Sequence, residues 1–415
     1  MNENSMEHIS PIQPRERFII LDVLRGIALL GICLANFPEF SLYTFQKSEV
    51  AASMPTAGID RVVRYLQYLF IDGKFYTLFS LLFGIGFSII LSNAQRKGIS
   101  GFRIFYRRML ILALIGFIHL LFIWSGDILF LYALLGMLLP LFRKFSDKNL
   151  LWLSAGFVLF PIVVDALTTV GRVNLSEPAV RLQQYYCDLY GITDDNFGIW
   201  LRDADSYGDV FRFLVQGAFV RVQEFIDGHR ALKVMGLFIL GYYIGRNGIY
   251  ANLTDRKEWL MKVCRIGFLV GFPTSALYAW SAVNHYPAGV VFHSLLYAVS
   301  VVPMGLAYIT GICLLFHRKR DWRIWEYLAV PGRMALTNYI GQSVSGMLLF
   351  YGIGLGLGAS IGLSGTEVIA VGVFLFQIAF STIWLHYFQF GPLEWIWRML
   401  TYGRWLSIFK RAVIS

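Results

Sequence analysis

The chain has 415 residues, of which 57% are hydrophobic, 16% aromatic and only 15% charged. A mean hydropathy of +0.58 excludes an ordinary soluble globular protein. The formal net charge of +10 does not indicate nucleic acid, because basic residues beside apolar segments are typical of cytoplasmic loops and no nucleic-acid-binding motif is found. The composition therefore predicts an all-α, polytopic transmembrane helical bundle whose first partner is the lipid bilayer.

The first apolar segment, residues 18–40, carries charged and polar side chains where a membrane helix rarely has them. Asp22 lies three residues before Arg25, and Asn36 lies eleven residues after it, so all three share one helix face. Arg25 and Asn36 are about 16 Å apart along the axis, roughly half the hydrocarbon thickness. Charged groups inside a membrane are usually functional, so this face predicts a site; the alternative is a local Asp22–Arg25 pair that only orients the helix.

Ten apolar segments are long enough to cross a membrane, within a range of nine to twelve because the fourth is short. They are residues 18–38, 75–93, 109–125, 128–142, 150–170, 231–246, 263–283, 289–316, 334–355 and 367–387. Lys and Arg gather in alternate connections, and this pattern predicts that those connections and both chain termini are cytoplasmic.

Three stretches organise the chain. We expect an N-terminal transmembrane bundle over residues 1–170, an extracytoplasmic loop with an interfacial helix over 171–230, and a C-terminal transmembrane bundle with a cytoplasmic tail over 231–415. The four cysteines have no paired spacing, and no metal-ligand spacing joins the histidines, so neither a disulfide framework nor a metal site is expected.

His119 and Asp127 are candidates for acid–base chemistry. Imidazole titrates nearest neutrality, although a lone buried histidine is more often a structural hydrogen-bond donor. If its helix begins near Met109, His119 lies about 15 Å above the inner interface, near the bilayer centre. Asp127 follows at the outer turn, where it either caps the next helix or faces the same cavity as Asn36.

A polar stripe opens the ninth apolar segment. Asn338, Gln342 and Ser345 recur at helical spacing behind Arg333. Such a stripe either bonds neighbouring helices or, together with the charged pair of the first segment, lines a cytoplasmic vestibule.

Five blocks of sequence carry a resemblance to a known family. They are LDVLRGIALLGICLANF, GKFYTLFSLLFGIGF, GDILFLYALLG, GRMALTNYIGQS and FGPLEWIWRMLTYG. In this order, and over nearly the whole chain, they resemble the YeiB-like family of bacterial polytopic membrane proteins, whose C-terminal half is a domain of unknown function. The resemblance implies a multi-pass protein of the bacterial cytoplasmic membrane.

More distantly, the first segment with its terminal asparagine resembles the heparan-glucosaminide acetyltransferases, within a wider group of transmembrane acyl transferases. That resemblance implies acyl-CoA as donor substrate, Asn36 as the group that polarises its carbonyl, and a small molecule or lipid as acceptor on the far side. The distant enzymes carry a histidine soon after the asparagine, whereas residues 37–60 hold Lys47 and no histidine. The base then falls to His119, Asp127 or Asp60. The donor-binding candidates are Asp22, Arg25, Arg333, Asn338 and Gln342.

Three functions of different class remain open. The first is a transmembrane acyl transferase, the second a transporter or permease for a small molecule or lipid, and the third a non-catalytic membrane protein. Binding of acyl-CoA to the purified protein separates the first from the other two. A homodimer is compatible with each of them.

Overall fold

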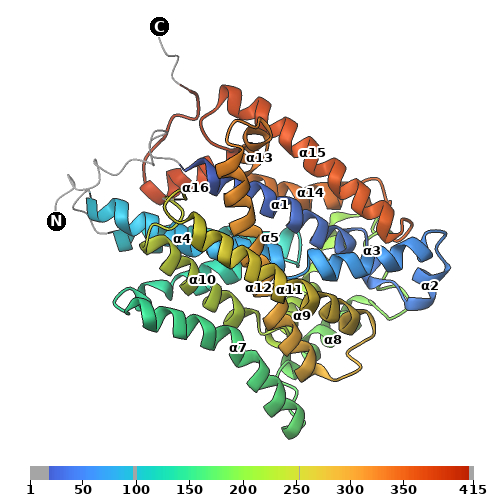
Figure 1. Cartoon of the computed structure of the whole chain (residues 1–415). Helices are drawn as coiled ribbons and strands as arrows, with labels where there is room; N and C mark the ends of the chain where they lie inside the picture. Colours follow the sequence, from blue (N-terminus) through green and yellow to red (C-terminus); the bar gives the residue numbers. More distant parts are fainter. Residues whose placement is uncertain (1–17, 97–100, 252, 411–415) are drawn as a thin grey trace.

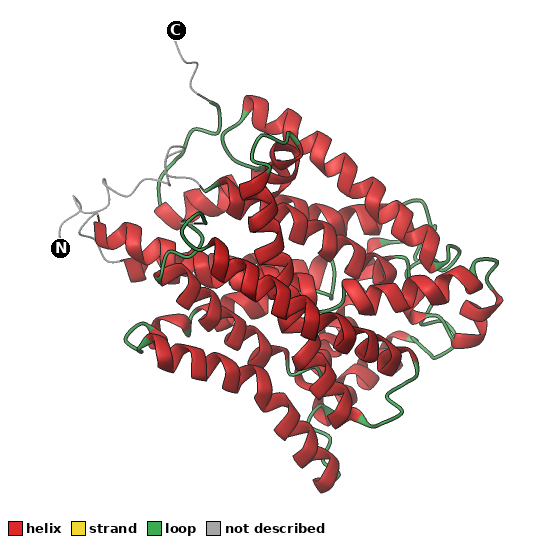
Figure 2. Cartoon of the chain, viewed as in Figure 1, coloured by secondary structure: helices red, strands yellow, loops and turns green. Residues whose placement is uncertain are grey.

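The computed structural model describes residues 18–96, 101–251 and 253–410, which form a bundle of α-helices (Figures 1 and 2). Within these ranges the extended pairing is limited to a single bridge between Phe388 and Phe409. The all-α fold expected from the composition is therefore confirmed. The helices are α1 (Ile19–Phe40), η3 (Tyr43–Phe45), α2 (Ser48–Ser53), α3 (Ala57–Phe70), α4 (Lys74–Arg96), α5 (Gly101–Phe122), α6 (Leu129–Gly136), η4 (Leu139–Phe142), α7 (Asp147–Gly171), α8 (Glu177–Tyr190), α9 (Tyr207–Asp227), α10 (Arg230–Arg246), α11 (Lys257–Val283), α12 (Val290–Arg318), α13 (Ile324–Arg333), α14 (Ala335–Phe350), α15 (Leu363–Tyr387) and α16 (Pro392–Tyr402).

Seven helical stretches of the described chain are long and apolar enough to cross a membrane. They are α1, α3 with α4, α5, α7, α11, α12 and α15. The other three of the ten expected spans correspond to shorter elements, namely α6 with η4, α10 and α14. The expected number is thus reached only when these shorter helices of the bundle are included.

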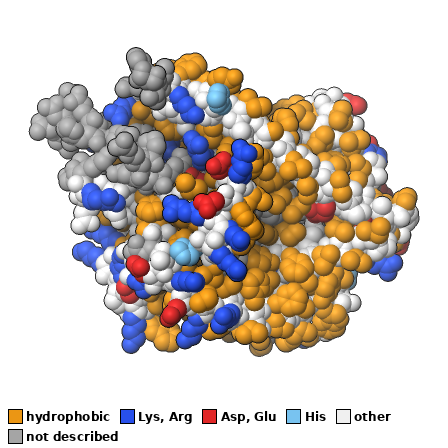
Figure 3. All heavy atoms as spheres, turned by 45° about the horizontal axis from the view of Figure 1, so that its top comes forward, with side chains coloured by type: hydrophobic (Ala, Val, Ile, Leu, Met, Phe, Trp, Pro, Cys, Tyr) orange, Lys and Arg blue, Asp and Glu red, His pale blue; other side chains and the backbone are white. Residues whose placement is uncertain are grey.

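The outer surface of the bundle is apolar. Leu269 is 74% exposed, Val368 72% and Phe376 67%, and each lies on a helix of membrane-crossing length. Figure 3 shows a broad hydrophobic surface beside a region where Lys and Arg side chains gather. Such an extended apolar surface is unfavourable in water and matches the acyl chains of a bilayer.

Glycines allow α4 and α10 to pack backbone against backbone. A Cβ atom on Gly84 would lie 2.2 Å from the carbonyl oxygen of Phe238, and one on Gly241 would lie 2.2 Å from that of Leu81. Neither position tolerates a side chain without separating the helices. Close approach through small residues is the usual way in which membrane helices associate, since lipid removes the hydrophobic driving force between them.

The first helix lies among helices of the C-terminal part. α1 packs against α13, α14 and α15 as well as against α4, and α10 packs against both α4 and α7 (Figure 1). Helices from residues 1–170 and from 231–415 therefore share one bundle. The stretch 171–230 contains two helices, α8 and α9, where one interfacial helix was expected. α9 packs against α5, α8 and α10.

Candidate functional site

Three buried side chains form a continuous hydrogen-bonded chain, which we call the relay. Nδ1 of His119 lies 2.8 Å from Oδ1 of Asp127, and Nε2 of His119 lies 2.9 Å from Oγ of Ser343. His119 is 0% exposed, and Asp127 and Ser343 are each 1% exposed. The imidazole is thus held at both nitrogens, with a carboxylate on one side and a hydroxyl on the other.

The relay lies near the C-terminal end of α5, a helix that begins earlier than expected. α5 begins at Gly101 rather than near Met109. The basic residues before Met109 therefore belong to the first turns of the helix. Its long arginine side chains can reach water or headgroups while the backbone stays helical. His119 is therefore about 27 Å from the start of α5 and within one turn of its last residue, Phe122.

Asp127 caps the next helix, which is the first of the two alternatives for its position, and it also contacts His119. While Oδ1 meets His119, Oδ2 accepts a hydrogen bond of 2.7 Å from the backbone N–H of Phe130 in the first turn of α6. A carboxylate that accepts from a helix N-terminus is held in place. The connection between α5 and α6 therefore orients the histidine.

Ser343 was not among the residues singled out from the sequence. The polar stripe on α14 directed attention to Gln342 and Ser345, whereas Ser343 between them faces His119. Tyr339, one helical turn before Ser343, places its ring 5.3 Å from the imidazole ring. The spacing of Tyr339 and Ser343 on one face of α14 was the only available signal, and it does not identify the partner helix.

Aromatic side chains separate the relay from α1. The ring of Trp124 lies 6.1 Å from that of His119 and 4.5 Å from that of Phe40. Asn36 is one turn before Phe40 on the same face of α1, is half-buried, and hydrogen-bonds to no described residue. The structure therefore places Asn36 at the same end of the bundle as the relay.

Asp22 and Arg25 form the local ion pair that the sequence suggested, with 2.9 Å between Oδ1 and Nη1. Asp22 is buried and Arg25 half-buried. Two other arginines are close enough to Arg108 of α5 to act on its charge. They are Arg398 of α16 and Arg25. We call Arg25, Arg108 and Arg398 the basic end of the bundle.

The helix α16 completes this basic end. The guanidinium of Arg108 lies 3.8 Å from the ring centroid of Trp397, and Nε1 of Trp397 donates to the backbone oxygen of Arg108 at 3.0 Å. Stacking on an indole holds an arginine while leaving edge N–H groups for a ligand. The aromatic and basic residues of α16 thus dock this helix against α5.

Glu394 links the basic end to the helix that carries Ser343. Its Oε1 accepts from the backbone N–H groups of Leu336 and Thr337, and its Oε2 accepts from Oγ1 of Thr337 at 2.6 Å. Burial raises the pKa of Glu394, although these hydrogen bonds act in the opposite direction. The side chain caps the first turn of α14.

The amides of Asn338 and Gln342 connect helices. Nδ2 of Asn338 donates to the backbone oxygen of Pro331 and to Oγ of Ser381, and Nε2 of Gln342 donates to Oε1 of Gln377. Gln342 also donates to the backbone of α1 at Leu29. Both side chains are buried. They bond neighbouring helices, which is the first of the two alternatives given for the polar stripe. Arg333, the last residue of α13, is half-buried.

Asp60 and Lys47 lie away from the relay. Asp60 is buried and accepts hydrogen bonds from the backbone and side chain of Ser364 and from Thr56, so it caps α15. Lys47 pairs with Asp195 at the exposed surface. In the described ranges no group of three His, Cys, Asp or Glu side chains is placed to hold a metal ion, and the four cysteines are free.

Helices of membrane-crossing length with a lipid-like surface define a multi-pass integral membrane protein. Residues 244–404 match the family described as "Protein of unknown function (DUF418)". The chain is 29% identical to "Uncharacterized protein YxaH" of Bacillus subtilis, over 99% of this chain and 100% of that protein. It is 28% identical to "Uncharacterized protein YeiB" of Escherichia coli, over 93% of this chain and 96% of that protein. The resemblance to the YeiB-like family is therefore confirmed. No solved structure matches the chain significantly.

Proposed function

We propose that the protein is a membrane acyl transferase in which the relay moves an acyl group from acyl-CoA to an acceptor. The observation that supports this function is the order Ser343–His119–Asp127, with 2.9 Å and 2.8 Å between successive partners. A hydroxyl that attacks a carbonyl must lose its proton. An imidazole oriented by a carboxylate at its other nitrogen takes that proton, whatever the fold around it.

The reaction takes two steps. Oγ of Ser343 attacks the thioester carbonyl while its proton passes to Nε2 of His119, and the C–S bond then breaks as the thiol leaves with that proton. In the second step the acceptor hydroxyl or amine attacks the serine ester, His119 takes the acceptor's proton, and Oγ of Ser343 recovers it as the ester bond breaks. Asp127 stabilises the imidazolium that exists between these transfers.

We assign to Asn36 the role of hydrogen-bond donor to the carbonyl oxygen of the thioester. Its amide makes no bond to a described residue, whereas the amides of Asn338 and Gln342 are both used between helices. An N–H donor at the developing oxyanion contributes most where water is excluded. Asn36 reaches that position only when the ring of Trp124, which lies between Phe40 of α1 and the imidazole, turns aside. The buried surroundings of the relay meet that condition.

The basic end is the site that we assign to the phosphates of the donor. Arg25, Arg108 and Arg398 come from three helices and gather at the end of the bundle opposite the relay. Guanidinium groups bind phosphate oxygens in pairs and keep their charge. When the phosphates of the donor bind at the basic end, its acyl group extends into the bundle and approaches Ser343 along α14. Glu394 holds the first turn of that helix in place.

Access to the relay requires a movement of side chains. His119 and Ser343 are closed to solvent, and the rings of Trp124 and Tyr339 lie against the imidazole. An acyl group therefore enters only when one of these rings turns aside. Such gating is common in enzymes that exclude water from an activated ester.

Binding of acetyl-CoA to the purified protein tests the donor site. We expect Arg25→Lys to weaken binding by about tenfold or more, because a point charge replaces a planar fork that binds two oxygens. Arg61→Lys, at an exposed position of α3, is the matched control and should bind as the wild type does. Unchanged affinity in Arg25→Ala would exclude Arg25 from the donor site. Preserved binding after exchange of Asp22 and Arg25 would assign the pair a structural role.

This assignment requires the basic end to face the cytoplasm. In a protein without its native cysteines, we expect Asp195→Cys and Tyr286→Cys to react with an impermeant maleimide on whole cells, and Arg320→Cys to react only after lysis. All three positions are exposed. Labelling of residue 320 on intact cells would reverse the orientation and remove the donor site from the cytoplasm.

A further inference from the structure

A second group of charged side chains lies on the first turn of α10. Arg230 and Lys233 are three residues apart, so they lie on one face of the helix. The guanidinium of Arg230 lies 5.9 Å from the ring centroid of Tyr76, and Nζ of Lys233 lies 3.8 Å from that of Tyr297. Both cations are half-buried. We call Arg230 and Lys233 the cation pair.

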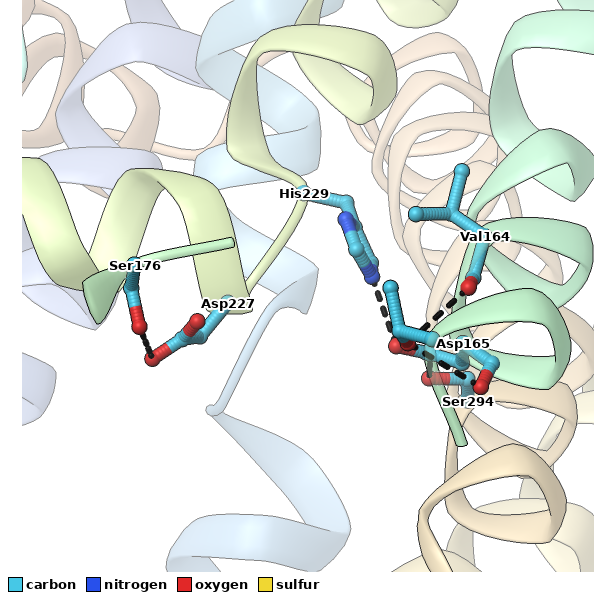
Figure 4. Close-up of polar contacts among 7 residues, drawn as sticks. Val164, Asp165, Ser176, Asp227, His229 and Ser294 are labelled. Atoms are coloured by element: carbon cyan, nitrogen blue, oxygen red, sulfur yellow. Dashed lines mark hydrogen bonds and ion pairs between the residues drawn. The ribbon is translucent and has the colours of Figure 1, made fainter. Parts of the chain in front are cut away.

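Two of the carboxylates around the cation pair, Asp165 and Asp72, are engaged with other groups. Asp165 of α7 accepts hydrogen bonds from Nε2 of His229 at 2.7 Å and from Oγ of Ser294, and Figure 4 shows both side chains pointing at it from separate elements. The hydroxyl of Tyr278 donates to Asp72 at 2.5 Å.

Two further acids lie near Arg230. Glu224 forms its ion pair with Arg221, which also donates to the backbone oxygen of Ser125. Glu39 lies within electrostatic range of both Arg221 and Arg230, but it forms an ion pair with neither. Among the described residues, neither member of the cation pair has an ion-pair partner or a side-chain hydrogen bond.

Two positive charges held one turn apart and half out of water repel one another and lose hydration. An anion between them offsets both costs. A phosphate suits this pair, because a guanidinium binds two of its oxygens and an ammonium binds another. The tyrosine rings beneath the two cations keep them in place.

We propose that Arg230 and Lys233 bind the phosphate group of a second ligand. The site lies on the same side of the bundle as the relay, because Glu39 is within electrostatic range of both Arg230 and Arg221. Arg221 in turn lies 5.7 Å from the ring of Trp124, whose ring is 6.1 Å from that of His119. A phosphate held there belongs to the acyl acceptor, an assignment that rests on the proposed function. The phosphate itself comes either from a lipid headgroup or from a free phosphorylated molecule.

Binding to the purified full-length protein in detergent tests this site. Glycerol 3-phosphate is compared with glycerol, and dihexanoylphosphatidylglycerol with dihexanoylglycerol, so that each pair differs only in the phosphate-bearing part. We expect tighter binding of at least one phosphate compound than of its phosphate-free analogue. Preference for glycerol 3-phosphate identifies a soluble ligand, and preference for the short-chain lipid identifies a headgroup. The proposal fails if neither phosphate compound is preferred.

Variants locate the site. Arg230→Gln and Lys233→Gln should each weaken binding of the preferred compound by about tenfold or more, whereas Lys257→Gln, which removes an exposed cation at the start of α11, should not. If Arg230→Gln does not fold, Arg230→Lys keeps the charge and should still weaken binding. Unchanged affinity in the folded variants would overturn the proposal. His119→Ala should bind the phosphate normally, so failure of acyl transfer leaves this test intact.

Discussion

We expect His119→Ala to lower acyl turnover by on the order of a hundredfold or more while acetyl-CoA binding persists. Among the residues that the structure describes, His119 alone hydrogen-bonds to both Ser343 and Asp127, so its loss leaves the serine without a base. The basic end, where the donor's phosphates bind, is untouched. A loss of turnover without a loss of affinity is the signature of a missing proton acceptor.

Two further variants separate catalysis from packing. His119→Gln retains hydrogen-bonding capacity but cannot take up a proton near neutral pH, so it should be as inactive as His119→Ala. Ser343→Ala should also be inactive, whereas Ser345→Ala, on the same helix and outside the relay, should not. Full turnover in a well-folded His119→Gln protein would make His119 a structural donor, and the base would then have to be sought at Asp127 or Asp60.

Gly332→Ala should destabilise the protein strongly, as should Gly26→Ala. A Cβ atom on Gly332 would lie 1.9 Å from the backbone oxygen of Asp22, and one on Gly26 would lie 1.8 Å from that of Leu328. Both obstacles are backbone atoms, so α1 and α13 must move apart. Overpacking costs about 1 to 3 kcal/mol, and a shift of two backbones belongs at the upper end of that range.

Thermal unfolding in detergent measures this effect. Gly372→Ala is the matched control, because its Cβ on α15 would meet nothing within 4 Å, and it should unfold at or slightly above the wild-type temperature. Acetyl-CoA affinity should fall with Gly332→Ala, since the displaced contact includes Asp22, the ion-pair partner of Arg25. Wild-type stability in Gly332→Ala would show that the contact between α1 and α13 is looser than described.

Many of the membrane-crossing helices follow from the sequence, because long apolar segments have few alternative explanations. The start of α5 does not. Arg103 and Arg107 precede the third expected span, residues 109–125, yet both are exposed residues of α5. Long basic side chains are compatible with a helix that continues through the interface, so charge alone does not mark where a membrane helix begins.

The candidate site was predicted in part. Asp127 and His119 were identified by residue type, but Ser343 required knowledge of which helix faces α5. The cation pair was missed altogether, because Arg230 and Lys233 read as ordinary residues before an apolar helix. Their significance depends on Asp165 and Asp72, which lie far away in the chain and are occupied by other donors. Hydrophobic periodicity contains no information about which polar groups are already satisfied.

The most direct test of the account is a search for the acyl-serine. The purified protein is incubated with acetyl-CoA labelled in its acetyl group, quenched in acid and digested, and the peptide that contains Ser343 is examined by mass spectrometry. We predict label on Ser343 in the wild-type protein, none in Ser343→Ala, and much slower labelling in His119→Ala. Bound acetyl-CoA with no label on Ser343, in a preparation that transfers the acetyl group to an acceptor, would contradict the two-step relay.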